Sequence, residues 1–403
     1  MSPERARKNE REQGPGRAEA GYNSATGRHG HQQLHCEPSM SEIPRSDAIV
    51  QQGIADGLHI GAQLYASVKG RPVVERAWGE SRPGVAMTTG TIMLWLSSVK
   101  PVGAVAILQL VERGRLTLDD PVARYIGEFA AGDRYAVTVR HLLTHTAGLR
   151  NVELDPLVMS WDEIIDRICA APLETDWIPG ERAGYSPQTS WYLLAELVRR
   201  LDGRDYSTYV RDEIFLPFVM GYSWNGMSAE QYRDYVQRIA TMPDMTKRDR
   251  PPQRYTIEQG ATVCVPGGNG MGPARELGAF YMMLLGGGQR FARILTPESL
   301  AMMTSRQRIG MVDETFRHVM DWGLGLIINS KRYGENVPYG FGDHTSERTF
   351  GHGGARSSVG MADPEHGLAV AMIFNGTPGE RGHNTRIRAF LTALYEDLGL
   401  AAS

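Results

Sequence analysis

Strand patterns lie near both ends of this 403-residue chain and are scarce in its middle. Residues 59–68 and 72–79 flank a short Lys-Gly turn, which is typical of a β-hairpin and so of an antiparallel sheet. Strand patterns return at residues 322–329, near 357–362 and at 368–375. The predicted fold class is therefore α/β (α+β): an antiparallel sheet shared by both chain ends, flanked by helices, with a large, mainly helical insertion.

Helical periodicity and composition suggest how the chain is divided. Apolar residues recur at helical spacing from Ser97 to about Arg113, and Gly114 is expected to end that helix. The first 40 or so residues are poor in large hydrophobic side chains, which favours disorder. The predicted organisation is a disordered N-terminal tail at residues 1–44, an α/β sheet domain at 45–114 and 265–403, and a mainly helical domain at 115–264.

Composition and charge limit the partners that the chain is expected to have. With 41% hydrophobic residues it can bury a large core. A formal net charge of −3 and the lack of a long basic block argue against nucleic acid or an anionic membrane as partner. No apolar stretch approaches the ~20 residues of a membrane span, and no secretory signal peptide is visible. Cys36, Cys169 and Cys264 form no Cys-x-x-Cys pattern, so we expect reduced thiols in the cytoplasm.

Ser97 and Lys100 are the first candidate catalytic residues. They lie three positions apart at the predicted start of a helix, so both side chains project from one face. A serine hydroxyl is a poor nucleophile until an adjacent base activates it, and Lys100 is placed to do so. Alone, a Ser-x-x-Lys match is weak evidence, because Ser97 or Ser98 could simply cap the helix beside a solvated lysine.

Two further segments supply candidate site residues. Tyr185 lies between a Pro-Gly loop and a predicted helix, and a phenol near an amine can pass protons to and from a serine oxygen. His352, Gly353, Gly354 and Ala355 precede a strand pattern, where paired glycines allow close approach by a ligand and an amide can face an oxyanion. The plain alternatives are a loop aromatic packed on the core and a glycine hairpin with a surface histidine.

Together these motifs resemble those of the serine β-lactamase and penicillin-binding-protein superfamily, over roughly residues 45–398. The order is that of the superfamily: Ser97-x-x-Lys100, Tyr185-Ser-Pro and His352-Gly-Gly. The resemblance is closest to the class C-like branch, which includes family VIII carboxylesterases, D-aminopeptidases and some acyltransferases. The His-Leu-Leu-Thr-His-Thr-Ala-Gly segment that begins at His141 is also similar to that branch. The resemblance implies a β-lactamase/transpeptidase-like fold.

The resemblance also implies a role for each motif residue. Ser97 would be the acylated nucleophile, and Lys100 and Tyr185 the general acid/base pair. The amides of Ser97 and Ala355 would form the oxyanion hole, and His352, Gly353 and Gly354 would help to bind the substrate. Which residue is the base stays open, and a coupled Lys100/Tyr185 pair that shares a proton is the expectation. No cofactor and no metal are predicted.

The sequence departs from the superfamily pattern at two positions. The second motif usually ends in an asparagine that clamps the substrate amide, and here that position is Pro187. In true lactamases the third motif is Lys-Thr-Gly, so His352 replaces a fixed cation by a group charged only near or below about pH 6.5. Both changes favour an ester or thioester over a β-lactam. His141 and His145 are interpreted as structural, and the glycine-rich residues 267–272 as a loop near the site mouth instead of a nucleotide loop.

Three functions are compatible with these residues. The first is a cytoplasmic serine carboxylesterase that works through a covalent acyl-serine on a small-molecule ester or thioester. The second is an acyltransferase that passes the same acyl group to a small-molecule acceptor, because the chemistry is identical up to the acyl-enzyme. The third is a catalytically silent binding protein on the same fold. The sequence does not predict an oligomeric state.

Overall fold

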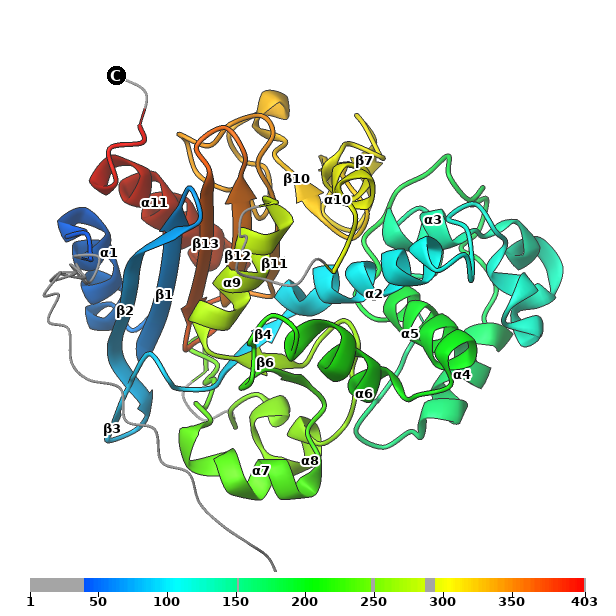
Figure 1. The fold of residues 1–403 in the computed structure, drawn as a ribbon, viewed down its shortest axis with the longest axis horizontal. Helices are drawn as coiled ribbons and strands as arrows, with labels where there is room; N and C mark the ends of the chain where they lie inside the picture. Colours follow the sequence, from blue (N-terminus) through cyan, green and yellow to red (C-terminus); the bar gives the residue numbers. More distant parts are fainter. Residues whose placement is uncertain (1–39, 151, 248–250, 287–293, 402–403) are drawn as a thin grey trace, which may run out of the picture. The chain divides into compact units, whose positions relative to one another are not determined.

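Both ends of the chain contribute strands to one antiparallel sheet (Figure 1). The structure is a computed structural model that describes residues 40–150, 152–247, 251–286 and 294–401. Within these residues the sheet has eight strands in the order β3-β2-β1-β13-β12-β11-β10-β9. The strands are β1 (Gly61–Val68), β2 (Arg71–Arg82), β3 (Val85–Ala86), β9 (Asp321–Trp322), β10 (Ile327–Ile328), β11 (Phe350–Gly354), β12 (Ser358–Asp363) and β13 (Leu368–Phe374). The predicted fold class is confirmed.

The first hairpin forms where two strand patterns around the Lys-Gly turn predicted it. Lys69 and Gly70 join β1 to β2 with φ angles of 51° and 74°, which fit a two-residue type I′ turn. On its other side β1 pairs with β13, with Leu64 opposite Met372. The last strand of the chain therefore lies beside the first.

Strand β13 has one core on each face. Its even-numbered residues belong to the cluster that includes the apolar side chains of α11 (Glu380–Asp397). Its odd-numbered residues belong to the cluster that includes α9 (Ala274–Leu284), as expected for a strand with a period of two. Helix α1 (Pro44–Ala55) packs against α11. Figure 1 shows α9 on one face of the sheet and α1 and α11 on the other.

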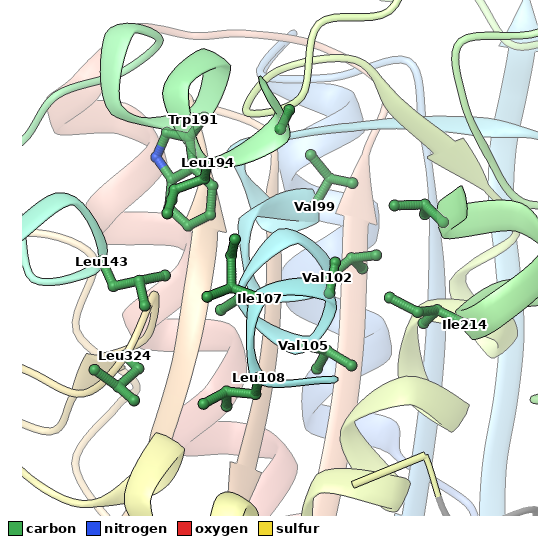
Figure 2. Packing of buried hydrophobic residues seen from close by; sticks show 14 of the residues in the cluster. Val99, Val102, Val105, Ile107, Leu108, Leu143, Trp191, Leu194, Ile214 and Leu324 are labelled. Atoms are coloured by element: carbon green, nitrogen blue, oxygen red, sulfur yellow. The ribbon is translucent and has the colours of Figure 1, made fainter. Parts of the chain in front are cut away.

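Helix α2 (Lys100–Glu112) joins the sheet to the helical part of the chain and is buried along almost its whole length. Figure 2 shows Ile107 of α2 near Leu143 and Trp191, which lie on two neighbouring helices. This packing holds Lys100, the first residue of α2, in place. The other helices are α3 (Val139–Leu143), α4 (Trp161–Ala170), α5 (Thr189–Asp202), α6 (Tyr206–Val210), α7 (Ala229–Tyr235), α8 (Glu258–Ala261) and α10 (Pro297–Thr304). A smaller sheet has the order β4 (Met93–Leu96), β6 (Gly270–Gly272) and β5 (Trp224–Asn225), and β7 (Val312–Asp313) pairs with β8 (His318–Val319).

The single strand predicted at residues 322–329 is wrong. The segment is a tight hairpin, in which β9 and β10 pair with each other. Gly323 donates its amide hydrogen to Leu326 O, and Gly325 has a φ angle of 69°, so the chain reverses within the apolar run. An apolar run with two glycines fits both a strand and a hairpin, and periodicity alone does not separate them.

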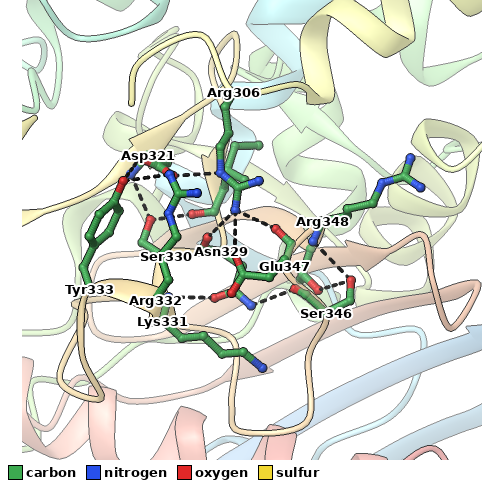
Figure 3. Close-up of polar contacts among 12 residues, drawn as sticks. Arg306, Asp321, Asn329, Ser330, Lys331, Arg332, Tyr333, Ser346, Glu347 and Arg348 are labelled. Atoms are coloured by element: carbon green, nitrogen blue, oxygen red, sulfur yellow. Dashed lines mark hydrogen bonds and ion pairs between the residues drawn. The ribbon is translucent and has the colours of Figure 1, made fainter. Parts of the chain in front are cut away.

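A buried carboxylate fastens this hairpin to the chain around it. Asp321 is fully buried and accepts hydrogen bonds from Arg306 Nε at 2.8 Å and Arg332 Nη2 at 2.6 Å. Figure 3 shows both guanidinium groups and the Tyr333 hydroxyl converging on it. Pairing with two cations offsets the cost of burying the carboxylate.

The predicted disordered tail lies mostly outside the described residues, which begin at residue 40. Its last part is corrected: Ile43 is fully buried, and α1 begins at Pro44 because its apolar side has the sheet and α11 to pack against. The division into a sheet domain and a helical domain stays a prediction. In the parts of the chain that the structure describes, no helix has the length and apolar character needed to cross a membrane.

Candidate active site

Ser97 and Lys100 meet at a sharp change of direction between β4 and α2. Leu96 has a φ angle of 52° and a ψ angle of −133°, an uncommon backbone conformation for a side-chain-bearing residue. One 3-10 turn, Ser97–Val99, follows, and α2 begins at Lys100, three residues later than predicted. Lys100 Nζ lies 3.0 Å from Ser97 Oγ. Ser97 stays partly exposed while Lys100 is fully buried.

The simple capping interpretation of this motif is wrong. Neither the 3-10 turn nor α2 has a side-chain cap. The Ser98 hydroxyl instead donates to His352 O at 3.0 Å, which ties the turn to β11. Lys100 is not solvated, because it is fully buried.

The surroundings of Lys100 favour its neutral form. Burial holds the pKa of its amine well below the usual value. Its Nζ donates to Pro187 O at 2.9 Å and to Gly267 O at 2.5 Å. A neutral amine has two N–H groups and one lone pair. With both N–H groups on carbonyls, the lone pair is left for the Ser97 hydroxyl.

Tyr185 reaches the same serine oxygen from the other motif. Its hydroxyl donates to Ser97 Oγ at 3.0 Å. Its ring packs near His145 and Phe316, with centroid distances of 4.8 Å and 5.0 Å. Burial raises the pKa of the phenol, so the hydroxyl keeps its proton. Ser97 Oγ thus lies between a buried amine and a buried phenol, and the proton shared by Lys100 and Tyr185 stays a prediction.

A buried ion pair that the sequence analysis missed positions Tyr185. Asp313 accepts the Tyr185 amide hydrogen at 3.1 Å, and Thr315 Oγ1 donates to Tyr185 O at 2.9 Å. Arg308 Nη2 donates to Asp313 at 3.0 Å, and both side chains are buried. No motif marks these residues, because Asp313 lies 128 residues along the chain from Tyr185, which it contacts.

His145 and His141 occupy supporting positions. His145 Nδ1 accepts the Ser186 amide hydrogen at 3.1 Å, and burial, with the charge of Arg308 nearby, lowers the pKa of the ring far below its usual value. His141 Nδ1 accepts the Thr138 amide hydrogen at 3.2 Å in the cap of α3. Both contacts agree with the structural interpretation of these histidines.

The third motif lies on β11, which packs against the turn that carries Ser97. A side-chain carbon on Gly354 would lie 2.2 Å from Trp95 O, so only glycine allows this approach. One residue further, Ala355 is partly exposed and packs against the cluster that contains Leu96. The motif thus brings Ala355 to the same partly exposed region as Ser97.

His352 is a neutral group in this arrangement. Its Nδ1 lies 2.8 Å from Gly353 O and so carries the hydrogen, and its Nε2 has no partner among the described residues. Burial lowers its pKa to about 3. The ring is therefore uncharged throughout the physiological range, and not only above about pH 6.5 as the sequence suggested.

The cavity found in the structure lies away from these residues. A cavity of about 1250 Å³ between α11 and residues 329–343 does not include Ser97, Lys100 or Tyr185 in its lining. No group of His, Cys, Asp or Glu suited to a metal ion occurs in the described part of the chain.

The chain is similar to known esterases, acyltransferases and penicillin-binding-protein homologues. Esterase EstB of Burkholderia gladioli is 28% identical over 82% of this chain and 90% of its own length. Acyltransferase mokF of Monascus pilosus is 26% identical over 84% of this chain and 87% of its own. The crystal structure of a penicillin-binding protein homologue from Caulobacter crescentus superposes with a TM-score of 0.74, at 26% identity, over 89% of this chain and 99% of that one. The model of the β-lactamase family matches residues 46–394. This chain belongs to the β-lactamase family.

Proposed function

We propose that the protein is a serine carboxylesterase that forms a covalent acyl-serine on Ser97. One observation carries the proposal: the buried Lys100 amine lies 3.0 Å from Ser97 Oγ, with its two N–H groups held by carbonyls. A neutral amine with a free lone pair is the base that a serine hydroxyl needs. Burying a lysine is costly, and a catalytically silent binding protein would gain nothing from it, so the buried Lys100 counts against that alternative.

The proposed acylation step follows from these contacts. Ser97 Oγ attacks the ester carbonyl carbon while its proton moves to the Lys100 lone pair. The amides of Ser97 and Ala355 stabilise the oxyanion. The Tyr185 hydroxyl, already a donor to Ser97 Oγ, hands its proton to the leaving alcohol oxygen and is reprotonated by the Lys100 ammonium. The alcohol leaves, and Lys100 is neutral again.

Deacylation repeats these steps with water as the nucleophile. Water attacks the acyl carbonyl carbon, and its proton moves to Lys100. The bond between Ser97 Oγ and the acyl carbon then breaks, and Ser97 recovers a proton by way of Tyr185 and Lys100. The acid product leaves, and the site returns to its first state.

The surroundings of the site support an uncharged ester or thioester as the substrate. His352 is neutral and Pro187 offers no side-chain amide, so neither the cation nor the amide clamp suited to a β-lactam is present at these positions. The Phe316 ring lies tilted against the Tyr185 ring, with centroids 5.0 Å apart, and the Tyr339 ring lies 5.7 Å from that of Phe316. This aromatic wall would favour an apolar acyl or alcohol group.

An acyltransferase is the second candidate. The similarity to acyltransferase mokF favours it, and the acyl-enzyme would be the same. Only the acceptor differs, since an alcohol or amine of a small molecule would replace water. Cytoplasmic location is also part of the proposal, supported by Cys169 and Cys264, which are free thiols. A net charge of −3 supports the proposal that nucleic acid is not a partner.

Nitrophenol release from short-chain nitrophenyl esters tests the proposed function. We expect a burst equal to the enzyme concentration and then steady turnover, both lost in Ser97→Ala. Ser305→Ala is the matched control, because Ser305 is exposed and bonds only within its own turn. A burst that stalls until an alcohol is added favours the transferase. Release that persists in Ser97→Ala contradicts the mechanism.

A further inference from the structure

Arg386 on α11 is a buried cation without an acidic partner. It is 5% exposed, and no carboxylate in the described parts of the chain forms an ion pair with it. Its Nη1 donates to Leu58 O at 2.9 Å, and its Nη2 donates to Gly376 O and Arg356 O, each at 2.9 Å. Burying a charge without a counter-ion is costly, so carbonyl oxygens from three separate segments must compensate.

The other groups that face this guanidinium are uncharged. His59 Nδ1 lies 3.2 Å from Nη1, and His383 Nδ1 lies 3.5 Å from Nη2. Burial lowers the pKa of His59 to about 3 and that of His383 well below its usual value, so both rings are neutral. The Phe374 ring lies 4.1 Å from the guanidinium carbon. The guanidinium charge of Arg386 is therefore stabilised mainly by the three backbone carbonyls that accept its hydrogen bonds.

One of those carbonyls begins a chain of two peptide groups that ends at the proposed oxyanion hole. The peptide between Arg356 and Ser357 accepts from Arg386 at its oxygen, and its N–H donates to Gly354 O at 3.0 Å. Gly354 O belongs to the same peptide group as the Ala355 N–H. In a trans peptide the C=O bond and the N–H bond point in opposite directions. The Ala355 N–H therefore points away from the turn that Arg386 holds.

We propose that Arg386 is a positioning residue that orients and polarises the Ala355 amide through these two peptide groups. Hydrogen bonds in series strengthen one another, so a cation at one end makes the N–H at the other end a stronger donor. The strain in the turn needs such support, because Arg356 has a φ angle of 56°, a region that favours glycine. The inference rests on the proposed function, since it assigns Arg386 to the oxyanion hole of that reaction.

Arg386→Met tests the inference, with Arg388→Met as the matched control on the same helix. Arg388 is partly exposed and ion-paired with Asp343, so its loss leaves the turn intact. We expect Arg386→Met to lower kcat for nitrophenyl esters about 10-fold, with KM within about twofold, because losing an oxyanion donor outright lowers kcat by about 10²- to 10³-fold. Arg386→Lys, which keeps the charge, should recover part of the loss.

A boronic acid that forms a tetrahedral adduct with Ser97 separates this role from a general structural one. We expect its inhibition constant to rise about as much as kcat falls in Arg386→Met, and to stay unchanged in Arg388→Met. If Arg386→Met does not fold, the same comparison is made with Arg386→Lys, for which smaller changes in the same direction are expected. If the wild type is active and the Arg386 variant binds the boronate equally well, the role of Arg386 is wrong and the proposed function stands. A wild type without Ser97-dependent release overturns the proposed function instead.

Discussion

Replacing Lys100 with methionine tests whether the amine is neutral in the folded protein. Lys100 is fully buried, and burial lowers its pKa. A lysine in an unfolded chain has a pKa of about 10.4. Between the folded and the unfolded pKa the unfolded state binds more protons, so the unfolding free energy of the wild type rises with pH. The variant lacks this group and should lack this slope.

The magnitude follows from proton linkage. Within this window each pH unit changes the wild-type unfolding free energy by about 1.4 kcal/mol. Lys100→Met also loses the hydrogen bonds to Pro187 O and Gly267 O, each worth about 1 kcal/mol. We therefore expect the variant to be more stable than wild type near neutral pH, by about 1–3 kcal/mol. The difference should shrink as the pH rises towards 10.

Urea denaturation at a series of pH values measures these free energies. The control is Lys69→Met, the same substitution in an exposed turn. The Lys100 variant should also lose about 10²- to 10⁴-fold in kcat, the contribution of a general base. A constant difference across the pH range, or a less stable variant at neutral pH, contradicts a neutral Lys100, because the amine would then be protonated in the folded protein.

Three further substitutions follow from the site. Tyr185→Phe should lower kcat about 10²-fold or more while leaving the melting temperature close to that of wild type, because only the proton donor to Ser97 is lost; an unchanged kcat contradicts its role. Asp313→Ala should destabilise the fold by about 3–5 kcal/mol, because it leaves Arg308 buried without its partner; thermal unfolding checks this, and a stable variant contradicts it. His352→Gln should keep the wild-type pH profile of kcat/KM between about pH 5 and 8, because His352 has a pKa of about 3 and is neutral there; a lost acid limb contradicts this.

The sequence predicts residues whose chemistry is carried by their own side chains. Ser97, Lys100 and Tyr185 were found because their types and spacing are diagnostic, and the structure brings all three together. The two carbonyls that hold Lys100 belong to Pro187 and Gly267, and a carbonyl oxygen has no signature in a sequence. Such contacts follow only from the path of the backbone.

The same limit applies to groups that act through long-range contacts. Arg308 and Asp313 lie in a region of short strands and turns without a motif. Asp313 contacts Tyr185 only because the folded chain brings these two distant segments together. Strand patterns bounded by turns predicted β1, β2 and β13 well, because each forms one uninterrupted strand. They failed at β9 and β10, where a glycine-containing apolar run turns back on itself.

Mass spectrometry of the acid-quenched enzyme, after brief exposure to a nitrophenyl ester, tests most directly whether Ser97 is acylated. We expect one added acyl group per chain, on the peptide that contains Ser97, and none on the Ser97→Ala variant. An acyl group on another residue, or turnover without any acylated protein, contradicts the claim that Ser97 is the nucleophile.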